Sequence, residues 1–445
     1  MWFAFIIGLV MKMAEIKLKY RLNEVPPLPE LMLLGLQWLA VTVPVLIIIG
    51  KVVAELHFNE PLEQIVYMQK LFFVVAVSLL LQLIWGHRLP LIVGPATALL
   101  VAIIASQASG MGAIYSSVLI SGAVLTLVSI TGLFSYLKKL FTPRVVATIL
   151  ILIALTLTPT IMNLIINTDM AGTAFLNLCF AVALVLAMFV ANHVLMGIWR
   201  STLIVWATII GSLLYLLLVP HYQLLTMNAE IAFVSTFFSN FNLDLTIEPG
   251  VLVSFLVCFL ALSINDLGSI QSVGEVIKSD QMPQRVTRGI AFTGLSNVLS
   301  GLMGVIGQVN FSLSPGLIAA TGNASRFTLI PTGLGLLLIS FLPKVIAFMG
   351  SIPSAVVGAT MIYLMCSQIS AGLLVVYNGT KTINFESGLV IGLPLMLSII
   401  VSILPTETLA AFPTLARPII GNGFVVGVLA VLLMEHIIYR DKTAD

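Results

Sequence analysis

The stretch Leu89-Pro-Leu-Ile-Val-Gly-Pro-Ala-Thr-Ala-Leu-Leu100 decides the fold, because it sets a glycine and a proline inside an apolar segment. Pro95 cannot donate a backbone hydrogen bond, and Gly94 permits unusual dihedral angles. Inside a membrane, irregular backbone is tolerated only where it is buried in protein or lines a cavity. The sequence therefore predicts a broken membrane span at this point, next to a cavity.

A second stretch, Val309-Asn-Phe-Ser-Leu-Ser-Pro-Gly-Leu-Ile-Ala-Ala320, repeats this pattern with Pro315 and Gly316. Each stretch has a proline beside a glycine and then small helical residues. Two half-helices whose N-termini face one cavity would form a polar site from backbone amides and helix dipoles. The alternative is a pair of ordinary proline-kinked helices, and the matched positions in the two halves favour the site.

The composition places most of the chain in lipid. Of the 445 residues, 59% are hydrophobic and only 9% are charged. A soluble domain has about 25% charged residues. The net charge of +2 therefore says little about partners, and no nucleic acid is expected.

Apolar stretches of about 20 residues, each long enough to span a bilayer, recur along the chain with short polar breaks. They predict fourteen spans, seven before and seven after the hydrophilic break at 221–250: 31–50, 70–85, 89–106, 113–135, 145–166, 174–195, 201–219, 250–277, 289–306, 311–322, 327–349, 353–376, 388–404 and 418–438. Seven spans per half make the second half enter the membrane from the opposite side, as an inverted repeat. We therefore expect an all-α polytopic fold with broken helices in spans 3 and 10.

This pattern divides the chain into five segments. They are a cytoplasmic N-terminal segment (1–30), the first repeat (31–219), a periplasmic linker (220–250), the second repeat (251–438) and a cytoplasmic tail (439–445). Met11 or Met13 could be the true start, so whether residues 1–12 belong to the native protein stays open.

Basic residues set the orientation, since cytoplasmic loops collect lysine and arginine. With the N-terminus inside, the cytoplasmic side holds Lys12, Lys17, Lys19, Arg21, Arg88, Lys138, Lys139, Arg144, Arg200, Lys278, Arg285, Arg288, Arg326, Lys381, Arg440 and Lys442. The outer side holds Lys51, Lys70, Lys344 and Arg417. Both termini are therefore expected in the cytoplasm.

The eighth span carries polar residues in an apolar helix. Asn265, Ser269 and Ser272 share one helical face, and Asp266 is turned by about 100° from Asn265. A charged aspartate at the bilayer centre costs at least about 2.5 to 3.5 kcal/mol, so it should face the interior, pair, or hold a proton. Asp266 is thus a candidate for proton coupling, and a structural hydrogen bond to a neighbouring helix is the alternative.

Other chemistry lacks sequence support. The five histidines and three cysteines show no metal-ligand spacing, so no metal site is expected. The chain has no phosphate-binding loop, no dinucleotide turn and no nucleophile elbow. We expect no catalytic residues and no cofactor, and the protein is not predicted to be an enzyme. A membrane-embedded enzyme would need a convergent catalytic set, which the sequence lacks.

Several motifs resemble the nucleobase-cation symporter-2 family, also called the nucleobase-ascorbate transporters or xanthine/uracil permeases. The resemblance extends from about residue 31 over nearly the whole chain. The motifs are Gly35-Leu-Gln-Trp38, Val93-Gly-Pro-Ala-Thr97, Leu140-Phe-Thr-Pro-Arg-Val-Val146, Ser325-Arg326, Ser351-Ile-Pro-Ser-Ala-Val-Val-Gly358 and Gly421-Asn-Gly-Phe-Val-Val-Gly427.

This resemblance implies a transporter of nucleobases such as uracil or xanthine in the bacterial inner membrane. It implies proton symport and elevator-like motion of a core domain (spans 1–4 and 8–11) against a gate domain (spans 5–7 and 12–14). It also implies a homodimer formed through the gate domain. The alternatives are an uncoupled facilitator, or an anion carrier of the related sulfate-permease fold.

The family signature of span 10 matches here at Gly316, Thr321 and Gly322, but Leu313 stands where the family places Glu or Gln. Asn265 likewise stands where the family has a glutamate. The chain thus resembles a divergent branch of bacterial uracil/xanthine transporters. The substrate-binding positions that the resemblance implies are Gln37, Trp38, Ala96, Thr97, Asn265, Ser269, Ser312, Leu313, Ser314 and Gly316.

Overall fold

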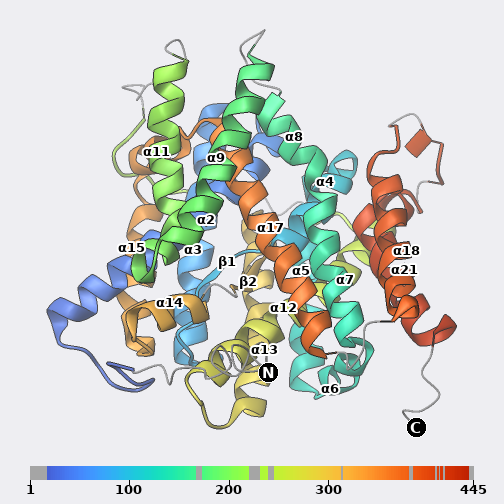
Figure 1. Ribbon diagram of the computed structural model, residues 1–445, viewed down its shortest axis with the longest axis horizontal. Helices are drawn as coiled ribbons and strands as arrows, with labels where there is room; N and C mark the ends of the chain where they lie inside the picture. The colour runs from blue at the N-terminus through green and yellow to red at the C-terminus, as the bar shows by residue number, and fades with distance from the viewer. Residues whose placement is uncertain are drawn as a thin grey trace, which may run out of the picture.

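The computed structural model describes residues 18–166, 173–219, 231–238, 245–311, 314–379, 384–405, 408–409, 411–413 and 416–439. This part of the chain forms a bundle of helices around one small sheet (Figure 1). The predicted site residues Ser312 and Leu313 lie outside the described residues.

The helices of the first half are α2 (Leu28–His57), α3 (Pro61–Ile84), α4 (Thr97–Ala105), α5 (Gly110–Ile130), α6 (Phe134–Leu137), α7 (Pro143–Thr156), α8 (Thr158–Ile166), α9 (Ala174–Val194), α10 (Gly197–Ser201) and α11 (Leu203–Leu218). Those of the second half are α12 (Pro249–Val276), α13 (Met282–Met303), α14 (Ser314–Thr321), α15 (Leu329–Ser340), α16 (Pro343–Gly350), α17 (Ser354–Gly379), α18 (Phe385–Ser402), α20 (Arg417–Ile420) and α21 (Gly423–Leu433). Several begin at a proline, whose fixed φ suits the first helical position and whose missing N–H is not needed there.

Eight helices of the described chain are long and apolar enough to cross a membrane. A ninth span is possible if the pair Arg326–Ser340 and Pro343–Gly350, bent by 95°, crosses as one. The shorter apolar helices Leu203–Leu218 and Gly423–Ile438 add to this set. The prediction of a helical multi-pass membrane protein is therefore confirmed, whereas the count of fourteen spans stays a prediction.

The sequence did not predict a sheet. Strand β1 (Val93–Pro95) pairs antiparallel with β2 (Gln308–Asn310), and Gly94 lies opposite Val309 (Figure 1). In each segment predicted to be broken, a three-residue strand leads into a short helix, α4 after β1 and α14 after β2. Both strands are fully buried.

Side chains satisfy the outer edges of this sheet. The Asn297 side chain on α13 donates to the Gln308 carbonyl oxygen (2.9 Å) and accepts from the Gln308 amide (2.9 Å). Next to β1, the amide of Ile92 donates to Ser314 Oγ (3.1 Å). Since unpaired backbone groups in an apolar interior cost several kcal/mol, about as much as in lipid, these contacts make the sheet tolerable at this depth.

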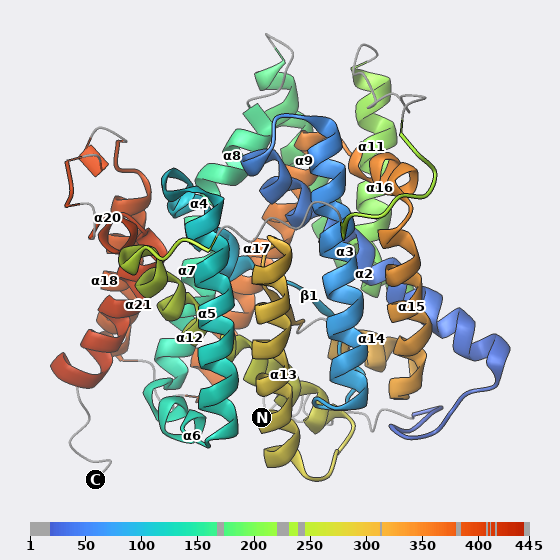
Figure 2. The ribbon, with the colours of Figure 1, turned by 180° about the vertical axis from the view of Figure 1, so that it is seen from behind.

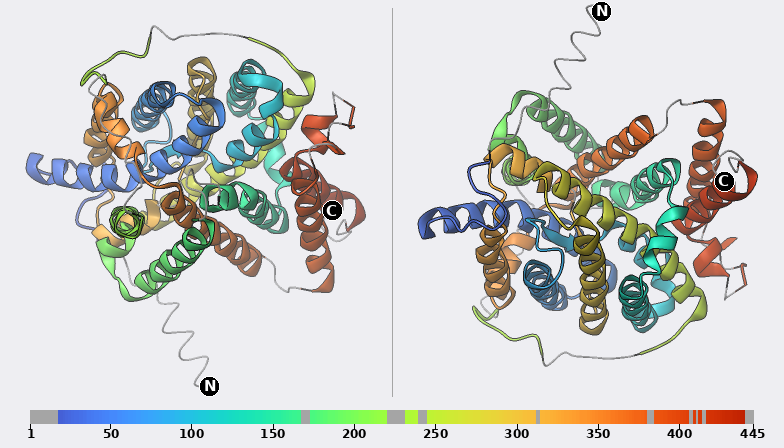
Figure 3. Two further views of the ribbon diagram at one scale, coloured as in Figure 1. Left: turned by 90° about the horizontal axis from the view of Figure 1, so that it is seen from above. Right: turned by 90° about the horizontal axis from the view of Figure 1, so that it is seen from below.

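Most of the described helices pack as two sets. One contains α2, α3, α4, α5, α12, α13, α14 and α15, and the other contains α7, α8, α9, α11, α17, α18 and α21. Figure 2 shows α5 and α13 side by side in the first set. Seen from above and below, α2 lies at one edge of the bundle and α18 with α21 at the opposite edge (Figure 3). The division into a moving core and gate stays a prediction.

Glycines allow the closest of these contacts. A Cβ on Gly294 of α13 would lie 2.7 Å from the Gly122 carbonyl oxygen of α5. A Cβ on Gly301 would lie 2.7 Å from the Tyr115 carbonyl oxygen. Small residues of this kind let two membrane helices approach closely.

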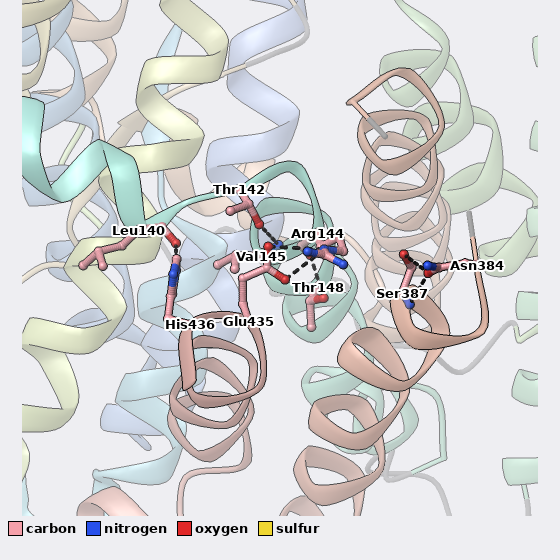
Figure 4. A network of polar contacts seen from close by, with 9 residues as sticks. All are labelled: Leu140, Thr142, Arg144, Val145, Thr148, Asn384, Ser387, Glu435 and His436. Carbon is pink, nitrogen blue, oxygen red and sulfur yellow. Dashed lines mark hydrogen bonds and ion pairs between the residues drawn. The ribbon is translucent and has the colours of Figure 1, made fainter. Parts of the chain in front are cut away.

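Polar contacts join the helical turn after α21 to the start of α7 (Figure 4). Arg144 forms a nearly buried ion pair with Glu435 (Nε to Oε2, 2.9 Å) in the π-helical turn that follows α21. The ring of His436 bonds the Leu140 carbonyl oxygen through Nε2 (2.8 Å), and Thr142 caps α7. These contacts connect the turn after α21 with the residues at the start of α7.

Candidate functional site

A cavity of about 100 Å³ lies beside the sheet, between the two helix sets. Its wall is mostly apolar, with polar groups from Thr97, Asn265, Ser367 and Gln368. The apolar lining residues are Val45, Ile49, Val309, Phe311, Leu364, Met365 and Ala371. A mostly apolar cavity with a few convergent polar groups is typical of a small-molecule site.

Two predicted residues line this cavity. Asn265 projects from α12, and Thr97 is the first residue of α4. Ala96, the N-cap of α4, is buried next to Thr97 and makes no side-chain cap, while its amide donates to the Gly307 carbonyl oxygen (2.9 Å). The sheet therefore fixes the start of α4 at the cavity.

Gly94 has a close-packing role in addition to its predicted helix-breaking role. A Cβ at Gly94 would lie 2.5 Å from the ring of Phe311. The missing side chain thus lets this ring lie against β1, where it forms part of the cavity wall. In the second segment, Pro315 follows Ser314 at the start of α14, where proline is well tolerated.

Ser269 and Ser314 lie outside the cavity lining. The Ser269 hydroxyl donates to the Asn265 carbonyl oxygen (3.0 Å). Ser314 Oγ donates to the Phe311 carbonyl oxygen (3.2 Å) in addition to accepting from Ile92. Gly316 is exposed, and nothing lies within 4 Å of a Cβ placed there.

Gln37 and Trp38 of α2 lie apart from the other predicted site residues. Trp38 is buried and donates from Nε1 to Thr328 Oγ1 (3.1 Å). Gln37 is half-buried, and its Oε1 has no hydrogen-bond partner within the described chain. Neither residue lines the cavity.

Asp266 is fully buried behind the sheet and does not line the cavity. Its carboxylate accepts three hydrogen bonds, from Thr293 Oγ1 (2.7 Å), the Asn310 amide (3.0 Å) and Asn310 Nδ2 (2.6 Å). Asp266 thus lies in the interior and accepts a hydrogen bond from the neighbouring helix α13, the structural role that stands as the alternative to proton coupling. The carboxylate therefore connects α12 with α13 and with β2.

The hydrogen bonds continue from Asp266 toward the end of α3. Gln82 Nε2 donates to Thr293 Oγ1 (3.0 Å), and His87 Nε2 contacts Asn310 Oδ1 (3.1 Å). Because His87 Nδ1 accepts from the Leu89 amide (2.9 Å), Nε2 carries the proton and donates to Asn310. Burial lowers the pKa of His87 to about 3, so its ring is neutral near pH 7.

Sequence reasoning missed Ser367 and Gln368, which bring the second helix set to the cavity. It also missed Asn310, Thr293 and His87 as partners of Asp266. The available signal was a polar residue inside an apolar run, as at Ser367-Gln368 in the span 353–376. Among the described residues, no three His, Cys, Asp or Glu side chains gather as metal ligands would.

These features define a multi-pass membrane transport protein, with a small cavity where two strand-and-helix segments meet. The chain belongs to the Permease family (Xan_ur_permease), whose model matches residues 29–407. It is accordingly a permease and not an enzyme, and the resemblance inferred from the motifs is confirmed.

Two curated relatives are similar along most of their length. The nucleobase transporter PlUacP of Paenibacillus larvae subsp. larvae is 26% identical over 391 residues, 84% of this chain and 87% of the relative. The xanthine permease of Bacillus subtilis is 24% identical over 416 residues, 90% of each chain.

Among solved structures, the transmembrane domain of the cyanobacterial bicarbonate transporter BicA has a similar fold. Its TM-score is 0.62 at 15% identity, and the match covers 85% of this chain and 98% of that domain. At this identity the likeness is one of fold alone.

Proposed function

We propose that this permease imports a nucleobase, such as uracil, xanthine or a related purine or pyrimidine, bound in the cavity between Asn265, Thr97 and Gln368. The observation that carries the proposal is the pair of side-chain amides in the cavity wall. An amide both donates and accepts, which suits the lactam edges of a planar base. The names of the two relatives, a nucleobase transporter and a xanthine permease, support the same substrate class.

The cavity favours an uncharged ligand over an inorganic anion. Among the described residues that line it there is no lysine, arginine or histidine. The ring of Phe311 adds an aromatic face on which a base can stack. The volume of about 100 Å³ is below the roughly 300 to 1,000 Å³ of sites for drug-sized ligands, as expected for a small ligand.

Proton coupling is assigned to Asp266 in this proposal. Its carboxylate accepts from Asn310, and Asn310 adjoins Val309 and Phe311 of the cavity wall. A shift of β2 on substrate binding would therefore change the hydrogen bonds of the carboxylate. We further propose elevator-like motion of the core domain against the gate domain, a homodimer, a bacterial inner-membrane location and cytoplasmic termini.

Uptake into proteoliposomes tests the substrate. Labelled uracil, xanthine, hypoxanthine, adenine and urate would each be offered with and without an inward proton gradient, alongside labelled bicarbonate. We expect at least one base to accumulate. If bicarbonate accumulates and no base is taken up or bound, the anion-carrier alternative is correct.

The Asp266→Asn variant tests the coupling. We expect it to equilibrate the base without concentrating it, because an amide cannot cycle a proton. Substrate binding, measured separately by calorimetry, should persist in this variant. If it still concentrates the base under a proton gradient, Asp266 is not the coupling residue.

A further inference from the structure

We propose that Arg88, Arg285 and Arg326 form a binding site for a phosphate-class anion where α3 ends, on the side predicted to face the cytoplasm. We call these three residues the arginine cluster. They come from three separate places in the chain: the α3–β1 connection, α13, and the 3₁₀ turn Arg326–Thr328 that precedes α15. Nothing in the proposed transport cycle uses them.

Two carbonyl groups of the last turn of α3 and that of His87, just after the helix, hold the cluster together. Arg88 Nε donates to the Ile84 carbonyl oxygen (2.8 Å), and Arg326 Nη1 donates to that of Leu83 (3.3 Å). Arg285 Nη1 donates to the carbonyl oxygen of His87 (3.0 Å). Three cations are therefore gathered at the negative end of one helix dipole.

The positive charge of the cluster is poorly compensated. Arg285 contacts Asp280 (Nη2 to Oδ1, 3.3 Å), but the Asp280 side chain is 78% exposed, so the pair is weak. Within the described residues, no carboxylate forms an ion pair with Arg88 or Arg326. Arg326 experiences the positive charges of both other members of the cluster.

One donor of the cluster is buried without an acceptor. Arg326 Nε has no hydrogen-bond partner in the described chain, although solvent does not reach it. A guanidinium offers five N–H donors in a planar fork that matches two oxygens of a phosphate. Because solvent does not reach Nε, the Arg326 side chain must shift before an anion oxygen accepts from this donor.

The backbone at Arg88 adopts a conformation that favours glycine. Its φ of +57° is in the left-handed region, which glycine adopts freely and other residues adopt at a cost. If Arg88 only closed the end of α3, glycine would do so without strain. Replacing Arg88 with glycine therefore removes the guanidinium without adding backbone strain.

A structural alternative is that the arginines only cap the free carbonyls of α3. That reading leaves Arg326 Nε without an acceptor. The phosphate can come from an anionic lipid headgroup of the inner leaflet or from free phosphate, since both present the same oxygens. An experiment can distinguish the two sources, because free phosphate would bind in the absence of lipid.

The test measures the melting temperature of the purified full-length protein in detergent. One arm compares added phosphatidylglycerol with phosphatidylcholine, and the other compares sodium phosphate with sodium chloride of equal ionic strength. A ligand that binds only the folded state raises the melting temperature. We expect a rise of at least about 3 °C with phosphatidylglycerol or phosphate.

Two variants separate the cluster from general charge effects. Arg88→Gly removes a guanidinium and relieves the left-handed strain, so its melting temperature without ligand should match or exceed that of the wild type. The rise in melting temperature that the anion causes should be less than half of the rise seen with the wild type. Arg288→Gln removes an exposed charge from the same helix as Arg285 and should keep the full response.

A response to phosphatidylglycerol alone identifies a lipid headgroup site. An Arg88-dependent response to sodium phosphate without lipid identifies a site for free anions. The proposal is overturned if neither anion raises the melting temperature of the wild type. It is also overturned if Arg88→Gly responds like the wild type, or if Arg288→Gln loses as much of the response as Arg88→Gly.

Discussion

The side-chain amide of Asn310 is held at both of its ends. Its nitrogen donates to Asp266, and its oxygen accepts from His87. Since the Leu89 amide fixes the tautomer of His87, the direction of every hydrogen bond along this path is set. His87 is therefore a positioning residue, which presents the Asn310 donor to a buried carboxylate.

The neutral state of His87 predicts a pH dependence of stability. The pKa is about 3 in the folded protein and about 6.5 when unfolded, so the unfolded chain takes up the proton first. This contribution is complete above about pH 6.5 and is lost as the pH falls toward 3, by about 1.4 kcal/mol per unit. Thermal unfolding in detergent between pH 4 and 7 measures it.

The His87→Gln variant should flatten this profile, because glutamine donates a hydrogen bond but does not titrate. The exposed His193, replaced in the same way, serves as the control and should leave the profile unchanged. A His87→Gln profile parallel to that of the wild type would show that the acid sensitivity arises elsewhere.

The side chain of Gln368 should contribute to binding of the base. If its amide contacts the base, Gln368→Ala should weaken binding by roughly tenfold, the value of one or two hydrogen bonds. Ser370 lies two residues away on α17, is exposed and does not line the cavity, so Ser370→Ala is the matched control. Equal affinities of the two variants, measured by calorimetry, would place the base elsewhere.

At the scale of elements, the strand-and-helix segment 93–105 depends on one missing side chain. A Cβ at Gly94 would overlap the Phe311 ring, so Gly94→Ala should displace that ring and reshape the cavity. We expect a loss of about 1 to 3 kcal/mol in stability, as for other overpacked interiors, and weaker base binding. Gly392→Ala on α18, where a Cβ meets nothing, should change neither quantity.

The broken segments show what a sequence can and cannot predict about elements. Proline beside glycine at 94–95 and 315–316 indicated that neither segment would be a continuous helix. The strands themselves were not predictable, because three residues are too few to show a period of two. Their pairing also depends on Asn297 and Ser314, whose side chains complete the ladder only in the folded chain.

The candidate site was predictable in part for a similar reason. Asn265 was identified because polar groups in an apolar span are unusual, and Thr97 was implied by the family resemblance. Whether Gln368 faces the cavity or another helix depends on the rotation of α17, which packing decides. The burial of Asp266 followed from its energetic cost in lipid, but its location behind β2 followed only from the sheet.

At the scale of the whole molecule, the distribution of lysine and arginine predicts that both termini face the cytoplasm. A green fluorescent protein fused after Asp445 should then fluoresce, and alkaline phosphatase fused there should be inactive. A second pair of fusions within the linker 220–250 should give the opposite result. An active phosphatase at the C-terminus would show that this end faces the periplasm and would contradict the predicted orientation.

The pairing of β1 with β2 also has a consequence for biosynthesis. Pro95 and Gln308 are partners, although about 210 residues separate them. At about 5 to 20 residues per second, a ribosome needs roughly 10 to 40 s to make that length. During this delay the backbone groups of β1 that pair with β2 have no partner. We therefore expect the first half to stay next to the insertion machinery, where protein or water can satisfy these groups, until the second half is made.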